Sequence, residues 1–259
     1  MPDLYNHERH EPPEDNDGIF KHDPHRAGNS GDTCNRFPGP SYPDCMEEEV
    51  FCGVDYCEIN LQFGFTHVRC PLASTSPCLY GRHSLHLDSL VVAVAGACPG
   101  NGSYLATKST CGVCFSPGAL ENLVFRVPDT PEYSHTSQRA ELNAAIAAIE
   151  ASKTYIFNGG QWRCGDACPT PCALTHLVIK SDSAYFVDGM TVHIEQWRKK
   201  GWRTARRTEV KNRDLWTKLY DMVYLLYVET GVAIDFWHVP RDQNEDAHVL
   251  ANLGLHITS

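Results

Sequence analysis

The feature that most constrains the fold is a series of short apolar segments that begins near residue 88. LVVAVAGA (90–97), TKSTCGVCFS (107–116) and ENLVFRVP (121–128) are each bounded by Pro, Gly, Asn or Asp, which is typical of strands and turns. A stretch rich in strong helix formers, residues 137–153, follows them. This order predicts three strands and then a helix.

The second half of the series alternates strands with helices. Residues 174–182 and 232–239 have the composition of buried strands, whereas 214–229 and 244–255 have helical apolar spacing. Three consecutive strands indicate an antiparallel meander, and strands that return through helices indicate parallel neighbours. We therefore expect an α/β fold in which helices flank a mixed five-stranded sheet.

The N-terminal third differs in composition. Residues 1–44 are polar and without hydrophobic period, so they are predicted to be a disordered tail. Residues 45–87 are predicted to be a Cys-containing extension packed on the main domain, with a small zinc module as the alternative. The main domain is assigned to residues 88–254.

Cysteine content and the N-terminus bear on the compartment. The chain has 12 cysteines, a number that would suit a disulfide-rich secreted protein, yet its first residues lack the apolar core of a secretory signal. No apolar run approaches the length of a membrane-spanning helix. We expect a monomeric intracellular protein with reduced thiols, in the nucleus or cytoplasm and without a membrane partner.

A second zinc candidate consists of Cys164, Cys168, Cys172 and His176, which recur at every fourth position. Two prolines between them prevent a single helix from presenting the set. A Cys-containing loop without metal is the preferred interpretation.

Five segments, taken in order, resemble motifs of the type 1 ribonuclease H family. They are VAVAGACPGNG, HTSQRAEL, LVIKSDSAYFVDGM, IEQWRKKGWRTARRTEVKNRDLW and FWHVPRDQNEDAHVLAN. The resemblance covers residues 88–254 and implies the ribonuclease H fold. It also implies hydrolysis of the RNA strand of an RNA–DNA hybrid, with two Mg²⁺ or Mn²⁺ ions held by four acidic residues.

Carried over by position, the resemblance gives a degenerate metal site. Glu141 and Asp182 match the second and third acids, and His238 matches the histidine of the family's mobile loop. Ala95 stands where the first acid belongs, and His248 where the fourth belongs. The metal ligands that remain are Glu141, Asp182 and His248.

Ala95 is the more serious departure. A methyl group offers no lone pair to bridge two cations, whereas the imidazole of His248 can ligate Mn²⁺ or Zn²⁺ better than Mg²⁺. Asp246 should face away from His248 on a helix, and Asp242 is a candidate replacement in the preceding loop. Ala95 has three explanations: degeneration into a binding protein, an engineered change that traps a substrate complex, or a natural variant within an active family.

The basic segment resembles the protrusion with which the family grips a duplex. The net charge is −10, yet residues 198–213 contain eight Lys or Arg and one acid, Glu209. The alternative is a solvated basic helix. The predicted contacts are Trp197, Arg198, Lys199, Lys200, Trp202, Arg203, Arg206, Arg207, Lys211 and Arg213.

Four further residues match positions where the family contacts nucleic acid. Asn101 and Thr136 fall where it holds a DNA phosphate and the nearby backbone. Ser137 and Gln138 fall where it contacts the duplex and the RNA 2′-hydroxyls. Thr136 and Ser137 are equally natural helix caps. The expected partner is an RNA–DNA hybrid or another A-like duplex. The alternatives are an active Mn²⁺-dependent enzyme with a rearranged site and a non-catalytic interaction or metal-binding module.

Overall fold

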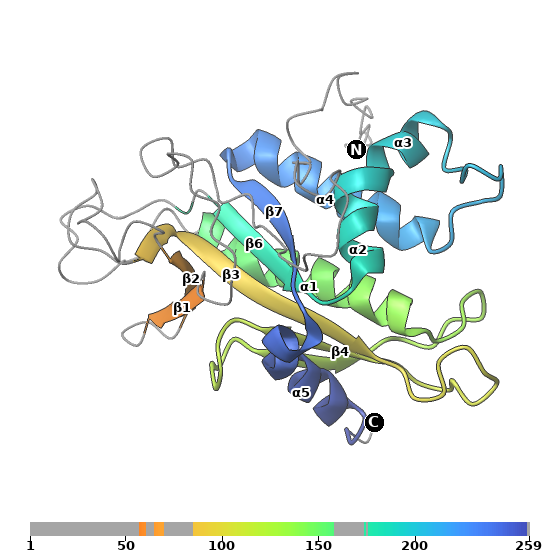
Figure 1. Cartoon of the computed structure of the whole chain (residues 1–259), viewed down its shortest axis with the longest axis horizontal. Coiled ribbons are helices and arrows are strands. Elements are labelled where there is room, and N and C mark those ends of the chain that lie inside the picture. Colours follow the sequence, from red (N-terminus) through yellow and green to blue (C-terminus); the bar gives the residue numbers. More distant parts are fainter. Residues whose placement is uncertain (1–56, 61–64, 70–84, 158–173, 175, 258–259) are drawn as a thin grey trace, which may run out of the picture.

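A mixed β-sheet forms the centre of the computed structural model, and helices cover both of its faces (Figure 1). The structure describes residues 57–60, 65–69, 85–157, 174 and 176–257. The strands are β1 (Cys57–Asn60), β2 (Phe65–Arg69), β3 (Leu85–Ala97), β4 (Thr110–Cys114), β5 (Leu123–Arg126), β6 (His176–Ser181) and β7 (Ala233–His238). The helices are α1 (Ser137–Phe157), α2 (Ala184–Asp188), the π-helix η3 (Gly189–His193), α3 (Ile194–Lys199), α4 (Arg213–Thr230), the 3-10 helix η4 (Arg241–Asn244) and α5 (Glu245–Gly254).

Five strands form the sheet that the sequence predicts, in the order β5-β4-β3-β6-β7. The pairs β3–β4 and β4–β5 are antiparallel. The pairs β3–β6 and β6–β7 are parallel. The predicted mixed sheet with its meander and parallel returns is therefore confirmed.

Two additional strands extend this sheet from within the region 45–87. Strand β2 pairs antiparallel with β3, with Thr66 opposite Val91, and β1 pairs with β2. The backbone N–H of Thr66 donates to the carbonyl of Phe115 (3.2 Å), so β2 lies along the same edge of β3 as β4. Part of the Cys-containing extension is thus continuous with the main sheet, and β3 begins at Leu85.

Some predicted features lie outside the described residues. These are the tail 1–44 and the group Cys164, Cys168 and Cys172. The boundary of the main domain at residue 88 remains a prediction. Within the described segments, no helix combines the length and apolar character needed to cross a membrane.

Strand β3 divides its side chains between two different layers, because side chains alternate along a strand. Val92 and Val94 belong to the main core, which α1 and α4 cover with Leu142, Ile149 and Trp216 among others. Ala93 and Ala95 face the opposite way, into a small cluster that α5 covers. One face thus carries a large core and the other a contact between small residues.

Two glycines allow the helices to approach the sheet closely. A Cβ at Gly112, which pairs with Ala95 across β3 and β4, would lie 2.3 Å from the carbonyl oxygen of Ala247 in α5. A Cβ at Gly96 would lie 2.5 Å from the backbone nitrogen of Glu141 in α1. Both distances are shorter than any real contact, so only glycine permits these packings. They fix α1 and α5 close to the end of β3.

Candidate active site and nucleic-acid interface

The residues that match the family's metal site converge at one edge of the sheet. Ala95 lies near the end of β3, Asp182 directly follows β6, and His238 ends β7. Since these three strands are parallel, their carboxyl ends meet at the same edge, which is where ligand sites of such sheets occur. Glu141 in the first turns of α1 and His248 in α5 complete the group.

Asp182 is surrounded by N–H donors. His248 Nε2 and Asn244 Nδ2 each lie 2.8 Å from Oδ1, and Arg241 Nη1 lies 3.4 Å from Oδ2. Burial alone would raise the pKa of Asp182, but the hydrogen bonds from His248 and Asn244 outweigh it and hold the pKa below its usual range. Because the carboxylate is an acceptor only, His248 must donate through Nε2.

Asn244 ties this site to the central strand. Its side chain is 1 % exposed, and Nδ2 also donates to the carbonyl of Val94 in β3 (3.0 Å). The amide of Asn244 therefore links β3 to the Asp182 carboxylate. The loop histidine His238 also lies at this edge of the sheet, with its imidazole Nε2 3.3 Å from the backbone oxygen of Asp182.

Glu141 occupies a separate, less polar environment. Its carboxylate accepts a hydrogen bond from Ser183 Oγ (2.5 Å). Burial, assisted by the negative charge of Asp182, raises the pKa of Glu141 to about 7 against the opposing effect of that hydrogen bond. The charges of His248 and Arg241 also oppose this rise in pKa without cancelling it.

Ala95 is sealed beneath α5. It is 1 % exposed, and it packs in a cluster with Ala93, Cys114, Ala247 and Ala251. The position that should supply a bridging carboxylate is thus part of an apolar contact.

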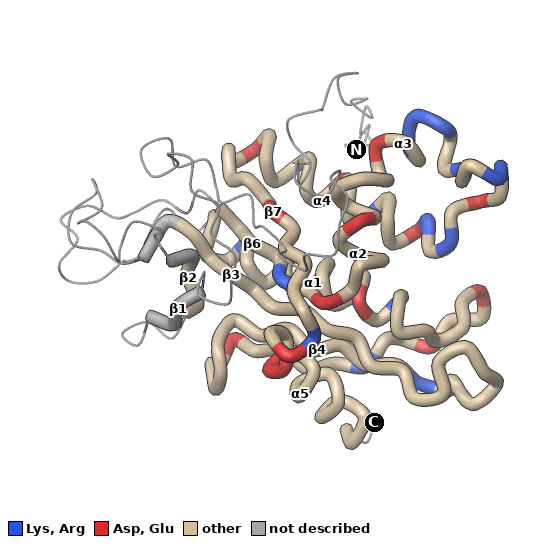
Figure 2. The backbone as a smooth tube through the Cα atoms, in the orientation of Figure 1, with Lys and Arg blue, Asp and Glu red and all other residues tan. Residues whose placement is uncertain are grey.

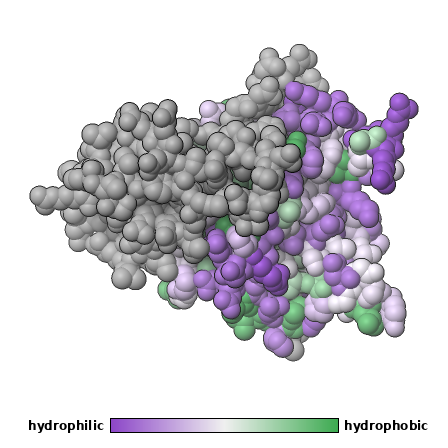
Figure 3. All heavy atoms as spheres, in the orientation of Figure 1, coloured by the Kyte–Doolittle hydropathy of each residue, from purple (hydrophilic) through white to green (hydrophobic). Residues whose placement is uncertain are grey.

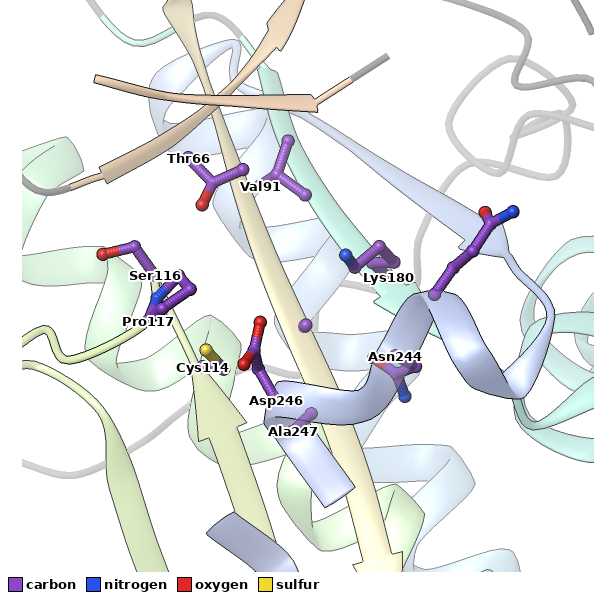
Figure 4. A pocket seen from close by; sticks show the side chains of 11 residues that line it. Thr66, Val91, Cys114, Ser116, Pro117, Lys180, Asn244, Asp246 and Ala247 are labelled. Atoms are coloured by element: carbon purple, nitrogen blue, oxygen red, sulfur yellow. The ribbon is translucent and has the colours of Figure 1, made fainter. Parts of the chain in front are cut away.

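Asp246 does not replace the missing acid. It lines a recess of about 300 Å³ on the side of the sheet that α5 covers, with Lys180 and Cys114 among its neighbours (Figure 4). This placement agrees with the helical spacing, which turns Asp246 away from His248. Asp242 is exposed on η4.

These residues do not fit a pair of divalent cations. Two carboxylates remain, and one of them is already engaged by three N–H donors. Among the residues that the structure describes, no three Asp, Glu, His or Cys side chains are arranged so that they could hold a metal ion. Hard cations such as Mg²⁺ need several oxygen ligands, which this group does not offer.

The segment from residue 198 to 213, here called the basic arm, projects between α3 and α4 (Figure 2). The corresponding surface is strongly hydrophilic (Figure 3). The exposed cations of the arm are Lys199, Lys200, Arg203, Arg206, Arg207, Lys211 and Arg213. Such a cluster of cations on an otherwise acidic protein is suited to the phosphates of a nucleic acid.

The tryptophans at the base of the arm point inward. Trp197 packs edge-on against Trp216, with ring centroids 5.4 Å apart, and Trp202 is only 9 % exposed. The guanidinium of Arg198 lies 5.3 Å from the ring centroid of Tyr220. The sequence predicts nucleic-acid contacts for Trp197, Trp202 and Arg198. In the structure these side chains anchor the arm to the domain.

A partly buried ion pair connects the arm to helix α1. The Arg139 side chain is 9 % exposed, and its guanidinium donates to both oxygens of Asp214 (3.0 and 2.8 Å) and to Asn212 Oδ1 (3.2 Å). Arg139 lies two residues before Glu141, and Asn212 and Asp214 lie where the arm joins α4. This pair fixes the arm relative to the helix that carries Glu141.

The remaining predicted contacts gather at the start of α1. Thr136 Oγ1 accepts from the backbone N–H of Arg139 (3.1 Å), so Thr136 caps the helix. Asn101 Oδ1 accepts from the backbone N–H of Ser137 (3.1 Å), which joins the β3–β4 turn to the same helix end. Gln138 is exposed. The helix-cap interpretation is confirmed for Thr136, and the nucleic-acid contacts stay predictions.

Sequence reasoning missed Asn244, Arg241 and Ser183. The available signal was position: Asn244 and Arg241 lie between His238 and His248, and Ser183 follows Asp182 directly. None of the three is acidic, so a search for metal ligands passes over them.

Known proteins of one family are similar to this chain in sequence. The family model described as RNase H matches residues 88–254. Human ribonuclease H1 is 32% identical over 171 residues, which are 64% of this chain and 50% of the human protein. Ribonuclease H of Paracidovorax citrulli is 35% identical over 173 residues, 65% of this chain and 95% of that protein. The chain thus spans about half the length of the human relative.

Two solved structures are similar at lower identity. Ribonuclease H1 of Halobacterium salinarum NRC-1 has 21% identity and a TM-score of 0.40, with 65% of this chain and 98% of that chain covered. LC11-RNase H1 in complex with an RNA/DNA hybrid has 17% identity and a TM-score of 0.41, with 64% and 96% covered. Since the family model matches well over half of the sequence, from residue 88 to residue 254, this chain belongs to the ribonuclease H family.

Proposed function

We propose that this protein binds RNA–DNA hybrids through a ribonuclease H domain whose two-metal hydrolysis is lost or strongly impaired. The relatives named above are ribonucleases H, and LC11-RNase H1 was solved with a hybrid. Hybrid binding depends on the exposed cations of the basic arm and on the start of α1. Cleavage depends on four carboxylates, of which this chain has two, Glu141 and Asp182.

Ala95 carries the proposal. It is 1 % exposed within an apolar cluster, at the position of the first acid. Without that acid, Glu141 and Asp182 supply two negative charges against the four positive charges of two divalent cations. An excess of buried positive charge is costly, so the chain is a poor host for the pair.

An active enzyme that depends on Mn²⁺ is the second candidate. His248 Nε2 lies 2.8 Å from Asp182 Oδ1, so an imidazole and a carboxylate lie side by side. Mixed nitrogen and oxygen donors suit Mn²⁺ better than Mg²⁺.

The deciding experiment measures binding and cleavage of one labelled hybrid in parallel. We expect binding at physiological salt with no cleavage in Mg²⁺ or Mn²⁺. Mn²⁺-dependent cleavage that Glu141→Gln abolishes would establish the second candidate instead. Absence of binding at low salt would contradict both and leave a module that has lost nucleic acid.

Duplexes of other composition define the substrate class. Affinity for double-stranded RNA and double-stranded DNA of the same sequence tests whether the chain prefers an A-like geometry, since 2′-hydroxyl contacts distinguish RNA from DNA. We expect the hybrid to bind more tightly than the DNA duplex.

A further inference from the structure

The carboxylate of Asp182 is already satisfied by the chain itself. Oδ1 accepts from His248 and Asn244 at 2.8 Å each, and Oδ2 faces Arg241 at 3.4 Å. Both oxygens therefore have an N–H donor, and the positive charge nearby comes from a guanidinium. A cation that approached this carboxylate would meet donors where it needs acceptors.

Near the position on β3 where the family has an acid, this chain has a hydrogen-bond donor, the side-chain amide of Asn244. Asn244 Nδ2 donates both to the Val94 carbonyl and to Asp182, so an amide connects the strand to the carboxylate. A metal ion would need oxygen ligands from both β3 and Asp182. In this chain, hydrogen bonds from Asn244 join β3 to Asp182 and require no ion.

Arg241 is placed to meet a ligand as well as Asp182. Its side chain is 73% exposed, and its contact with Asp182 involves only Nη1. A guanidinium carries five N–H donors in a planar fork that matches a phosphate, so most of this capacity faces solvent. The position lies on η4, between the loop histidine His238 and helix α5.

We propose that Arg241, His248 and Asn244 replace the divalent cations of this site, and that Arg241 contacts a backbone phosphate of the bound hybrid. The phosphate contact rests on the proposed hybrid binding, whereas the replacement of the metal does not. Hybrid affinity is then independent of divalent ions, and divalent ions do not stabilise the free protein.

The first test measures hybrid affinity by fluorescence anisotropy in EDTA and in Mg²⁺ at equal ionic strength. The expected affinities agree within about twofold, because phosphate contacts by side chains do not require a divalent ion. Arg241→Gln should weaken binding about fivefold and lower the salt slope by about one. The control Lys153→Gln removes a cation that pairs with Glu150 further along α1 and should bind as the unmodified chain does.

Two results of this test overturn the proposal. A tenfold or greater loss of affinity in EDTA would show that a divalent ion supports hybrid binding. Equal affinity of Arg241→Gln and the unmodified chain would remove the phosphate contact.

The second test needs no hybrid and uses the melting temperature of the full chain in MgCl₂ and MnCl₂. The unmodified chain should shift by less than about 1 °C, because an ion stabilises only a protein that binds it. Arg241→Gln combined with Ala95→Asp removes a cation and adds an acid, so a clear Mn²⁺-dependent rise is expected. His248→Asp with Arg241→Gln gives the same comparison and leaves β3 unchanged.

A large Mn²⁺ shift of the unmodified chain would overturn the replacement of the metal. So would the absence of any shift in both folded variants, because Arg241 would then not be what excludes the ion. If no hybrid binds at low salt, the proposed function fails, and the melting experiment still decides the state of the site.

Discussion

The basic arm and the group around Asp182 lie in one domain, but they differ in how closely they match the family's pattern. The arm has seven exposed Lys and Arg, and its base is held by the packing of Trp197 on Trp216 and by the partly buried Arg139–Asp214 pair. Of the four acids that the family resemblance implies for a metal site, only Glu141 and Asp182 are present. The arm thus has both its charge and its support, whereas the side chains that contact the Asp182 carboxylate are N–H donors rather than further acids.

This difference separates two requirements of a hybrid nuclease. Binding needs cations at the surface and a rigid base, and both are present. Hydrolysis needs acids close together, which repel one another unless metal ions are bound. Once Ala95 removes one acid, the remaining Asp182 can be satisfied by Asn244, His248 and Arg241. Asp182 therefore has its own arrangement of hydrogen bonds within the chain.

The largest effect should come from restoring the acids. Ala95→Asp with His248→Asp returns the site to four carboxylates, and we expect Mg²⁺-dependent cleavage at least about 100-fold above the unmodified chain, or about 2.7 kcal/mol in barrier. Ala95→Asp alone should restore a smaller part of this rate, because His248 and Arg241 then still donate to Asp182. Cleavage of a labelled hybrid by the four combinations in Mg²⁺ and Mn²⁺ is the measurement.

The restored variant also has a structural cost that can be checked. Ala95 packs under α5 opposite Gly112, so an aspartate there buries a charge and should lower the unfolding free energy by about 1–3 kcal/mol without metal. A variant that folds and binds hybrid but does not cleave would show that more than these ligands has been lost.

The next effect concerns the support of the arm. Arg139→Met keeps the volume but leaves Asp214 and Asn212 without their donor. The pair is only partly buried, since Asp214 is 33% exposed, so we expect a loss of about 2 kcal/mol in unfolding free energy. Urea unfolding measures it. The double change Arg139→Met with Asp214→Leu is the control and should recover much of the loss, because no unpaired charge remains.

Much of this arrangement follows from the sequence, for identifiable reasons. The strands of the five-stranded sheet contain short apolar segments bounded by turn residues, and Glu141, Asp182 and His248 were carried over from the family resemblance. The pairing of β1 with β2 and of β2 with β3 was not predicted, because the apolar residues of this region are irregularly spaced and pairing between distant segments leaves no local pattern. The inward position of Trp202 depends on a left-handed backbone (φ +61°) that nothing in its side chain encodes. The donors around Asp182 were missed because none of them is acidic.

A smaller effect is expected for single charges of the arm. Arg206→Glu removes one exposed cation and adds an anion, so hybrid affinity should fall about tenfold and the salt slope should decrease by about one. Lys153→Glu is a matched reversal on α1, away from the arm. Affinity that is insensitive to Arg206→Glu, or to salt, would mean that the arm does not carry hybrid binding.

The smallest effect separates the two roles of Thr136. Its hydroxyl caps α1 by accepting from the Arg139 N–H, and the family resemblance assigns it a phosphate contact as well. Thr136→Ala removes both, so unfolding free energy should fall by about 1 kcal/mol together with affinity. Thr136→Asp keeps a good cap but places a negative charge beside the phosphate, so stability should be retained while affinity falls several-fold. Equal affinity of the Asp variant and the unmodified chain would leave Thr136 with the cap as its only role.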